Sequence, residues 1–232
     1  MILPVISDIH SNLEALKRVL EKIDSDRILC CGDIVGYYTQ PNECIEKLRQ
    51  LKAISVSGNH DLACVTGDTS GFNPYAKKAI GWTRKVIKDK NIEFLRNLKR
   101  KIQIKIDNVN IMMVHGSPRD PISEYIFPST PIFPSTPDST LKSFLESENV
   151  DILIMGHTHV PFIKKFGNKL VFNPGSVGQP RDGDSRASFA FLDVPAKEVK
   201  IYRIKYDIDK VAAAIGDEKL PSSLGERLYN GI

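Results

Sequence analysis

All five histidines of this 232-residue chain lie at or just beyond the end of an apolar, strand-like segment. Oxygen-bearing side chains accompany them at equivalent places. The full set comprises Asp8, His10, Asp33, Asn59, His60, His115, His157 and His159. A single histidine after a strand is usually an ordinary core or surface residue. Five out of five, with carboxylates beside them, indicate a shared chemical role.

The ligand chemistry of this set points to metal ions. Imidazoles, carboxylates and an amide oxygen, without thiolates, suit Mn²⁺, Fe, Zn²⁺ or Ni²⁺ better than Ca²⁺. Even seven of these eight residues would be too many ligands for one tetrahedral ion, so the set predicts two divalent transition metal ions per chain, with Mn²⁺ preferred. Two such ions, about 3.5 to 4 Å apart, repel each other and need a bridging anion. Asp33 is the predicted bridge.

The first third of the chain alternates short apolar strands with amphipathic helices. We expect strands over residues 2–7, 27–31 and 53–57, and helices over 12–23 and 42–50. This alternation predicts a largely parallel sheet with right-handed crossovers. Loops at the carboxyl ends of such strands converge on one crevice, which would bring the candidate ligands together.

Two residues are candidate caps of these helices. Asn12 precedes the first helix, where capping is favoured over a hydrogen bond to metal-bound water. Asn42 follows Pro41 and precedes Glu43, which is typical of a helix N-cap. Both asparagines are therefore predicted to be structural.

The rest of the chain is rich in strands. One or two helices are expected within residues 73–98, followed by a strand-rich second half. This order predicts two mixed sheets packed face to face with helices outside, in a single domain over residues 1–232. The fold class is therefore α/β, with α+β character because the sheets are mixed.

A proline-rich loop interrupts this regular order within residues 117–137. Residues 126–137 are the hexapeptide Ile-Phe-Pro-Ser-Thr-Pro repeated twice, and four prolines in this stretch exclude a helix or a central strand. The segment is either a duplication in a tolerant surface loop or a lid that offers Phe127 and Phe133 to a substrate.

Composition limits the class of protein. The chain has 41% hydrophobic and 26% charged residues, with no apolar run of membrane-spanning length. We expect a cytoplasmic protein without a membrane partner. The net charge of +4 is too small to indicate nucleic acid as a partner. Its four cysteines lack a CxxC pair and are expected to be reduced and buried. The sequence is compatible with either a monomer or a homo-oligomer.

Five short motifs, in order, identify a family resemblance. They are DxH at 8–10, GDxxG at 32–36, GNHD at 58–61, His115 before a glycine, and GHTH at 156–159. Together they resemble the calcineurin-like metallophosphoesterase superfamily. The segments "GDIVGYYTQPNE", "HGSPRDP", "NPGSVGQPR" and "LPSSLGERLYNG" are similar to its compact prokaryotic branch, so the resemblance covers nearly the whole chain.

The resemblance implies a four-layer α/β/β/α sandwich and a role for each motif residue. Asp33 would bind both ions. The other predicted ligands divide into Asp8, His10 and His159 for the first ion, and Asn59, His115 and His157 for the second. His60 would act on the substrate as the catalytic residue instead of binding metal, and Asn59 would also face the substrate.

Two arginines could reach a substrate phosphate. Arg119 is a candidate substrate-binding residue, the alternative being an ion pair with Asp120. Arg181, which follows a glycine-containing turn, is a second candidate. Tyr37 and Tyr38 follow the bridge loop and could line the pocket.

The predicted activity is hydrolysis of phosphate esters by attack of a metal-bridging hydroxide. The leading hypothesis is a phosphodiesterase with broad activity on model substrates. The alternatives are a small-molecule or nucleotide phosphomonoesterase, a nuclease, and an inactive scaffold with this fold. Gly36 stands where related eukaryotic phosphoprotein phosphatases carry an aspartate that supports the catalytic histidine. A protein phosphatase of that kind is therefore not expected.

Overall fold

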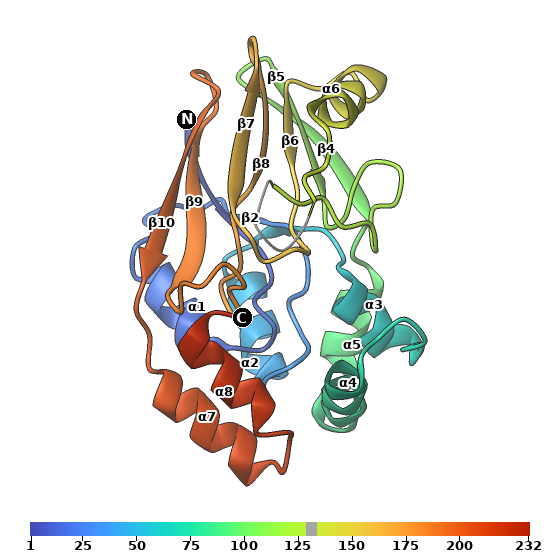
Figure 1. Cartoon of the computed structure of the whole chain (residues 1–232), viewed down its shortest axis with the longest axis vertical. Coiled ribbons are helices and arrows are strands. Elements are labelled where there is room, and N and C mark those ends of the chain that lie inside the picture. The colour runs from blue at the N-terminus through green and yellow to red at the C-terminus, as the bar shows by residue number, and fades with distance from the viewer. Residues whose placement is uncertain (129–133) are drawn as a thin grey trace.

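The computed structural model describes residues 1–128 and 134–232, and these residues form two five-stranded sheets (Figure 1). The first sheet has the order β10-β9-β1-β2-β3. Its strands are β1 (Ile2–Ile6), β2 (Leu29–Cys30), β3 (Ile54–Ser55), β9 (Ala187–Asp193) and β10 (Glu198–Ile204). Strands β1, β2 and β3 are parallel, whereas β9 runs antiparallel to β1 and to β10.

The second sheet has the order β4-β5-β6-β8-β7. Its strands are β4 (Lys101–Ile106), β5 (Val109–Val114), β6 (Ile152–Ile154), β7 (Phe162–Phe166) and β8 (Lys169–Asn173). The central β5, β6 and β8 are parallel, and the two edge strands pair antiparallel. Each sheet is therefore mixed, as expected for a chain that begins with strand and helix alternation and continues with short hairpins.

Helices flank the two sheets. They are α1 (Leu13–Leu20), α2 (Pro41–Gln50), α3 (Asn59–Thr66), α4 (Pro74–Val86), α5 (Asp89–Arg96), α6 (Asp138–Ser147), α7 (Ile208–Asp217) and α8 (Ser223–Asn230). Apolar residues of α1, α2 and α5 pack against the first sheet, and those of α6 pack against the second. A third cluster, with Val5, Leu29 and Ile111, lies between the sheets. The predicted four-layer α/β/β/α sandwich is confirmed.

The two candidate caps have different outcomes. Asn12 is the N-cap of α1, and its Oδ1 accepts the N–H of Ala15. Asn42, in contrast, lies inside α2, which begins one residue earlier at Pro41. Its side chain donates to the carbonyl of Val86 and accepts the N–H of Lys88. The N-cap prediction for Asn42 is therefore wrong, because this side chain ties α2 to the end of α4.

Only the ends of the tandem repeat are described, since residues 129–133, with Phe133, lie outside the described residues. Ile126 is buried. Phe127 and Thr136 exchange two hydrogen bonds, of 3.0 and 3.2 Å, which draw the ends of the repeat together. The lid role, the loop boundaries 117–137 and the single-domain assignment stay predictions.

Two further features concern the predicted environment of the chain. In the part of the chain that the structure describes, no helix is both long and apolar enough to cross a membrane. The four cysteines are free and buried, as predicted.

Candidate metal centre

The predicted site residues come together at the carboxyl ends of five strands. Each lies in the loop or helix start that follows its strand: Asp8 and His10 after β1, Asp33 after β2, Asn59 and His60 after β3, His115 after β5, and His157 and His159 after β6. All are buried except Asn59, which is half-buried. This convergence is the crevice predicted for parallel strands.

The loops that carry these side chains are bent into an uncommon backbone conformation. The φ angles of Asp8, His10, Asp33, His157 and His159 lie between 51° and 67°, in the left-handed region. Non-glycine residues rarely adopt this region, and each such residue costs on the order of 1 kcal/mol or more. The surrounding fold therefore holds these residues in place at a cost in stability, which is typical of functional sites.

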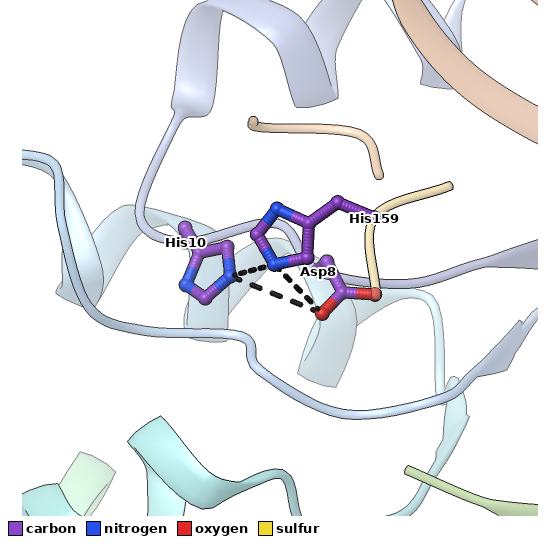
Figure 2. Close-up of side chains that lie close together, drawn as sticks. All are labelled: Asp8, His10 and His159. Carbon is purple, nitrogen blue, oxygen red and sulfur yellow. Dashed lines mark hydrogen bonds and ion pairs between the residues drawn. The ribbon is translucent and has the colours of Figure 1, made fainter. Parts of the chain in front are cut away.

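The first cluster contains Asp8, His10 and His159 (Figure 2). The Nε2 atoms of His10 and His159 are 3.0 Å apart. Oδ1 of Asp8 lies 3.3 Å from Nε2 of His159 and 3.9 Å from Nε2 of His10. Three potential ligand atoms from two sheets therefore face one point.

The second cluster surrounds the other side of Asp33. Ligand atoms of Asp33, His115 and His157 lie within 4.8 Å of one another. Nε2 of His115 is 3.3 Å from Oδ2 of Asp33 and 3.1 Å from Oδ1 of Asn59. The same Oδ2 of Asp33 lies 3.6 Å from Nε2 of His10 in the first cluster. One carboxylate oxygen therefore faces both clusters.

Backbone carbonyls fix the orientation of all four clustered imidazoles. Each ring directs one nitrogen at a carbonyl oxygen: His10 Nδ1 at Val35 (3.3 Å), His115 Nδ1 at Cys31 (2.8 Å), His159 Nδ1 at Gln179 (2.5 Å) and His157 Nε2 at Ser123 (3.1 Å). A carbonyl only accepts, so that ring nitrogen carries the hydrogen. In a neutral ring the opposite nitrogen then keeps a lone pair, as metal-binding histidines require.

This donor set fits divalent metal ions. Oδ1 of Asp8 is buried and has no hydrogen-bond donor among the described residues. Next to it, the Nε2 lone pairs of His10 and His159 face each other at 3.0 Å. A buried carboxylate oxygen and two converging lone pairs need a cation to offset their mutual repulsion. Aspartate and histidine are the ligand types that Mn²⁺, Fe and Zn²⁺ accept.

Burial and neighbouring charges set the protonation of these rings. Burial holds the pKa values of His10 and His159 well below the usual range, and it lowers the pKa of His157 to about 3. These rings are therefore neutral at pH 7, the form that binds metal. Burial also opposes protonation of His115, but the Asp33 carboxylate outweighs it and raises the pKa of His115 to about 9.

His60 lies close enough to His10 and Asp33 to form a third group that could hold a metal. It also faces a cavity of about 180 Å³, which Tyr37, Asn59 and His157 line as well. Burial lowers the pKa of His60 to about 4. Its Nδ1 has no hydrogen-bond partner among the described residues. The ring centroids of Tyr37 and Phe72 lie 4.5 and 4.6 Å from that of His60. Aromatic packing therefore orients this imidazole, and no carboxylate among the described residues accepts a hydrogen bond from its Nδ1.

Asp61, next to His60, has a structural role. Its carboxylate accepts the backbone N–H of Gly58, at the start of α3, and those of Ile34 and Val35, beyond Asp33. Burial, together with the nearby Asp33 carboxylate, raises the pKa of Asp61 to about 7. Asp61 thus ties the loop that carries Asp33 to the turn that carries Asn59 and His60.

Among the described residues, Arg119 makes no contact with the clustered aspartates and histidines. Its guanidinium pairs with the carboxylate of Glu124, not with Asp120, and packs 5.4 Å over the ring of Phe144. Its side chain is 64% exposed. The predicted contact of Arg119 with a substrate stays a prediction.

Sequence reasoning missed the residues that support the ligands from behind. The carbonyls of Ser123 and Gln179 orient His157 and His159, yet a backbone oxygen leaves no signature in residue type. Tyr125, whose ring stacks on His157 at 3.9 Å, was also missed. Its position between the His115 motif and the tandem repeat was the only available signal.

Comparison with known proteins places the chain in a family. The calcineurin-like phosphoesterase superfamily domain matches residues 1–197. An uncharacterized protein of Methanocaldococcus jannaschii, MJ0912, is 41% identical over 98% of this chain and 97% of its own. The phosphodiesterase MJ0936 of that organism is 23% identical over 74% of this chain and 81% of its own.

A solved structure agrees with this placement. The crystal structure of a metallophosphoesterase from Sphaerobacter thermophilus superposes with a TM-score of 0.85. It is 35% identical and covers 100% of this chain and 99% of its own. With clustered aspartates and histidines able to hold metal, the chain belongs to the calcineurin-like phosphoesterase superfamily and is a metal-dependent phosphoesterase, a hydrolase.

Proposed function

We propose that this enzyme is a dinuclear phosphodiesterase with broad activity on small phosphate esters. One observation carries the two-ion assignment: Oδ2 of Asp33 lies 3.6 Å from Nε2 of His10 and 3.3 Å from Nε2 of His115, which belong to different clusters. A carboxylate shared in this way is the arrangement that two neighbouring cations require. Mn²⁺ is the proposed metal, with Fe, Zn²⁺ or Ni²⁺ as alternatives.

The remaining ligands divide between the two ions according to the clusters. Asp8, His10 and His159 hold one ion, Asn59, His115 and His157 hold the other, and Asp33 is shared. When bound, the two metal ions would lower the pKa of a water molecule and neutralise charge on the phosphate oxygens in an in-line displacement. The carbonyl partners of the histidines keep the ligand nitrogens directed inward while this happens.

His60 is the proposed catalytic residue on the substrate side. Its ring lines the same cavity as Asn59, so both side chains would face a phosphate group bound in that cavity. With a pKa of about 4, His60 is neutral at pH 7 and acts by donating its N–H to a phosphoryl oxygen or to the departing oxygen. Arg119 reaches the substrate in this proposal only if its ion pair with Glu124 opens.

A preference for phosphodiesters is supported by the name of a related protein and by the arrangement of two cavities. MJ0936, a relative along most of its length, is named a phosphodiesterase. The cavity at His60 shares Tyr125 with a second cavity, of about 300 Å³. A diester has two organic groups to place beside the metal centre, and adjoining cavities provide room for both. A phosphomonoesterase acting on small molecules or nucleotides is the second candidate.

A substrate screen with the purified protein tests this proposal. Phosphomonoesters, diesters and nucleotides are compared in Mn²⁺, Ni²⁺ and Mg²⁺, and bound metal is measured by mass spectrometry. We expect diester hydrolysis to be fastest, with Mn²⁺ the best metal and two ions per chain. Faster monoester hydrolysis would favour the second candidate. A single ion per chain would contradict the dinuclear assignment, and fewer than one ion per chain after incubation with Mn²⁺ would favour an inactive scaffold with this fold.

A further inference from the structure

The second cavity, of about 300 Å³, lies directly beside the metal centre. It is lined by Tyr125, Phe127, Thr158, Val160 and Arg181. Tyr125 also lines the first cavity, together with His60 and His157. A group attached to a phosphate in the first cavity can therefore extend into the second. Its size is at the lower end of the range for small-molecule sites.

One part of this cavity is aromatic. The rings of Tyr125 and Phe127 are nearly parallel, with centroids 5.5 Å apart and an interplanar angle of 2°. Tyr125 also stacks on His157 at 3.9 Å, which places this aromatic wall against a proposed metal ligand. Tyr125 is 48% exposed, although large aromatic side chains usually bury more of their surface. A substrate group that covers Tyr125 would remove this apolar surface from water.

Arg181 adds a planar cation to the same lining. Its guanidinium donates to the neutral acceptors Gln179 Oε1 and Tyr37 Oη, at 2.8 and 3.1 Å. It also lies 5.8 Å from the centroid of the Tyr37 ring. These uncharged acceptors hold the guanidinium in place and leave its positive charge unpaired, since no described carboxylate forms an ion pair with it. A fixed guanidinium offers a flat face on which an aromatic ring can stack.

We propose that this cavity, the Tyr125–Arg181 pocket, binds a planar aromatic group of the ester substrate. The inference rests on the proposed function, because it places the phosphorus of that substrate at the metal centre. Tyr125 and Phe127 supply the aromatic wall, Val160 supplies apolar surface, and Arg181 supplies the planar cation. An aliphatic group of equal size would fill the same volume without gaining stacking or cation–π contacts.

Binding of non-hydrolysable phosphonates tests the pocket without relying on turnover. Phenylphosphonate and cyclohexylphosphonate carry the same head group and differ in the aromaticity of the ring. Calorimetric titration into the Mn²⁺-loaded enzyme is expected to give about tenfold tighter binding of the phenyl compound, the size of one stacking contact. Equal affinities, in both this pair and the nucleotide pair below, would overturn the inference.

A second pair of ligands separates two sources of the aromatic group, a simple aryl ester and a nucleotide. The phosphonomethyl analogue of AMP, in which carbon replaces the ester oxygen, is compared with the ribose phosphonate that lacks the base. A preference for the base-containing compound identifies a nucleotide as the source. A preference within the phenyl and cyclohexyl pair alone identifies a simple aryl ester.

Variants locate the effect in the pocket. Tyr125→Leu and Phe127→Leu should each reduce the preference for the aromatic ligand severalfold, and Tyr125→Phe should keep it. Tyr229→Leu is the matched control, because Tyr229 is similarly exposed, at 50%, but lies on α8 outside the pocket lining. If the aromatic preference survives in both leucine variants, the pocket assignment is wrong.

Two controls keep this test distinct from that of the proposed function. Metal content is measured in Tyr125→Leu because Tyr125 contacts His157. If this variant loses metal, Phe127→Leu alone is used to decide whether the pocket causes the preference for the aromatic ligand. Should the wild-type enzyme hydrolyse diesters but bind aromatic and aliphatic phosphonates equally, only the pocket inference fails. If it hydrolyses no phosphate ester with any metal, the proposed function fails and the pocket inference with it.

Discussion

The imidazole of His60 lies directly against Gly36. A Cβ atom on residue 36 would be 2.3 Å from Nδ1 of His60, and Gly36 has a φ of 106°, which side chains disfavour. The sequence departs here from eukaryotic phosphoprotein phosphatases of the same superfamily, in which an aspartate at the matching position supports the histidine. Here the same space is filled by the ring of His60 itself, which Tyr37 and Phe72 hold in place.

Adding a methyl group at residue 36 should displace this ring. We expect Gly36→Ala to lower kcat at least about tenfold while two ions remain bound, because the contact is with His60 and not with a ligand nitrogen. Steady-state kinetics and metal analysis measure the two effects. Gly183→Ala is the matched control, since Gly183 also has a positive φ, of 82°, but its added Cβ would meet no atom within 4 Å. Equal loss in both variants would point to backbone strain instead of contact with His60.

Replacement of His60 and Asp33 should separate catalysis from metal binding. His60→Ala is expected to keep two ions and to lose about 10²- to 10³-fold in turnover, the range for removal of one positioned hydrogen-bond donor. Asp33→Ala should lose metal and activity together, because its Oδ2 faces both clusters.

The leaving group of the substrate sharpens the His60 test. If His60 assists the departing oxygen, His60→Ala should affect esters of alkyl alcohols far more than those of p-nitrophenol, which leaves without help. Loss of metal from His60→Ala would mean that His60 is a ligand, a role that its proximity to His10 and Asp33 also allows. Full turnover with alkyl esters would contradict the assignment of His60 as a hydrogen-bond donor to the departing oxygen.

Asp61 should matter for stability because its carboxylate accepts three buried N–H groups. Asp61→Ala leaves these donors without their partner, so we expect the free energy of unfolding to fall by about 3 kcal/mol. For a chain of this length, the melting temperature should fall by roughly 6 to 12 °C. Calorimetry of the metal-free protein isolates this effect from metal loss. Asp68→Ala serves as an exposed control, and a similar shift there would contradict the assignment.

Metal binding itself should stabilise the fold, because the clustered ligands belong to loops from both sheets. At a Mn²⁺ concentration 100 times the dissociation constant, binding adds about 2.7 kcal/mol to the free energy of unfolding. We therefore expect the melting temperature to rise by roughly 5 to 10 °C with Mn²⁺ and to return to its starting value with chelator. Asp33→Ala should show little of this rise. An equal rise in that variant would indicate metal binding elsewhere on the chain.

The sequence determined the candidate metal ligands because it states residue type and position directly. Strands with polar residues just beyond their carboxyl ends predict convergence, as found for Asp8, Asp33 and His115. Alternation of strand and helix predicted the layers of the sandwich, because the spacing of apolar residues within a short segment indicates whether that segment is a strand or a helix. The bounds of individual elements were less accurate, since β2 and β3 have only two residues each and Asn42 bonds across to α4 instead of capping α2.

Tertiary structure alone decided how these residues are supported. The carbonyls of Ser123 and Gln179 that orient His157 and His159 are backbone atoms, which every residue type carries, so no sequence pattern marks them. Arg119 and Arg181 illustrate the same limit. Both were candidates for binding a substrate phosphate, yet one pairs with Glu124 on the surface and the other lines a cavity beside the metal centre. Their difference depends on which distant side chains the fold brings within reach, a relation between segments that residue type and spacing do not encode.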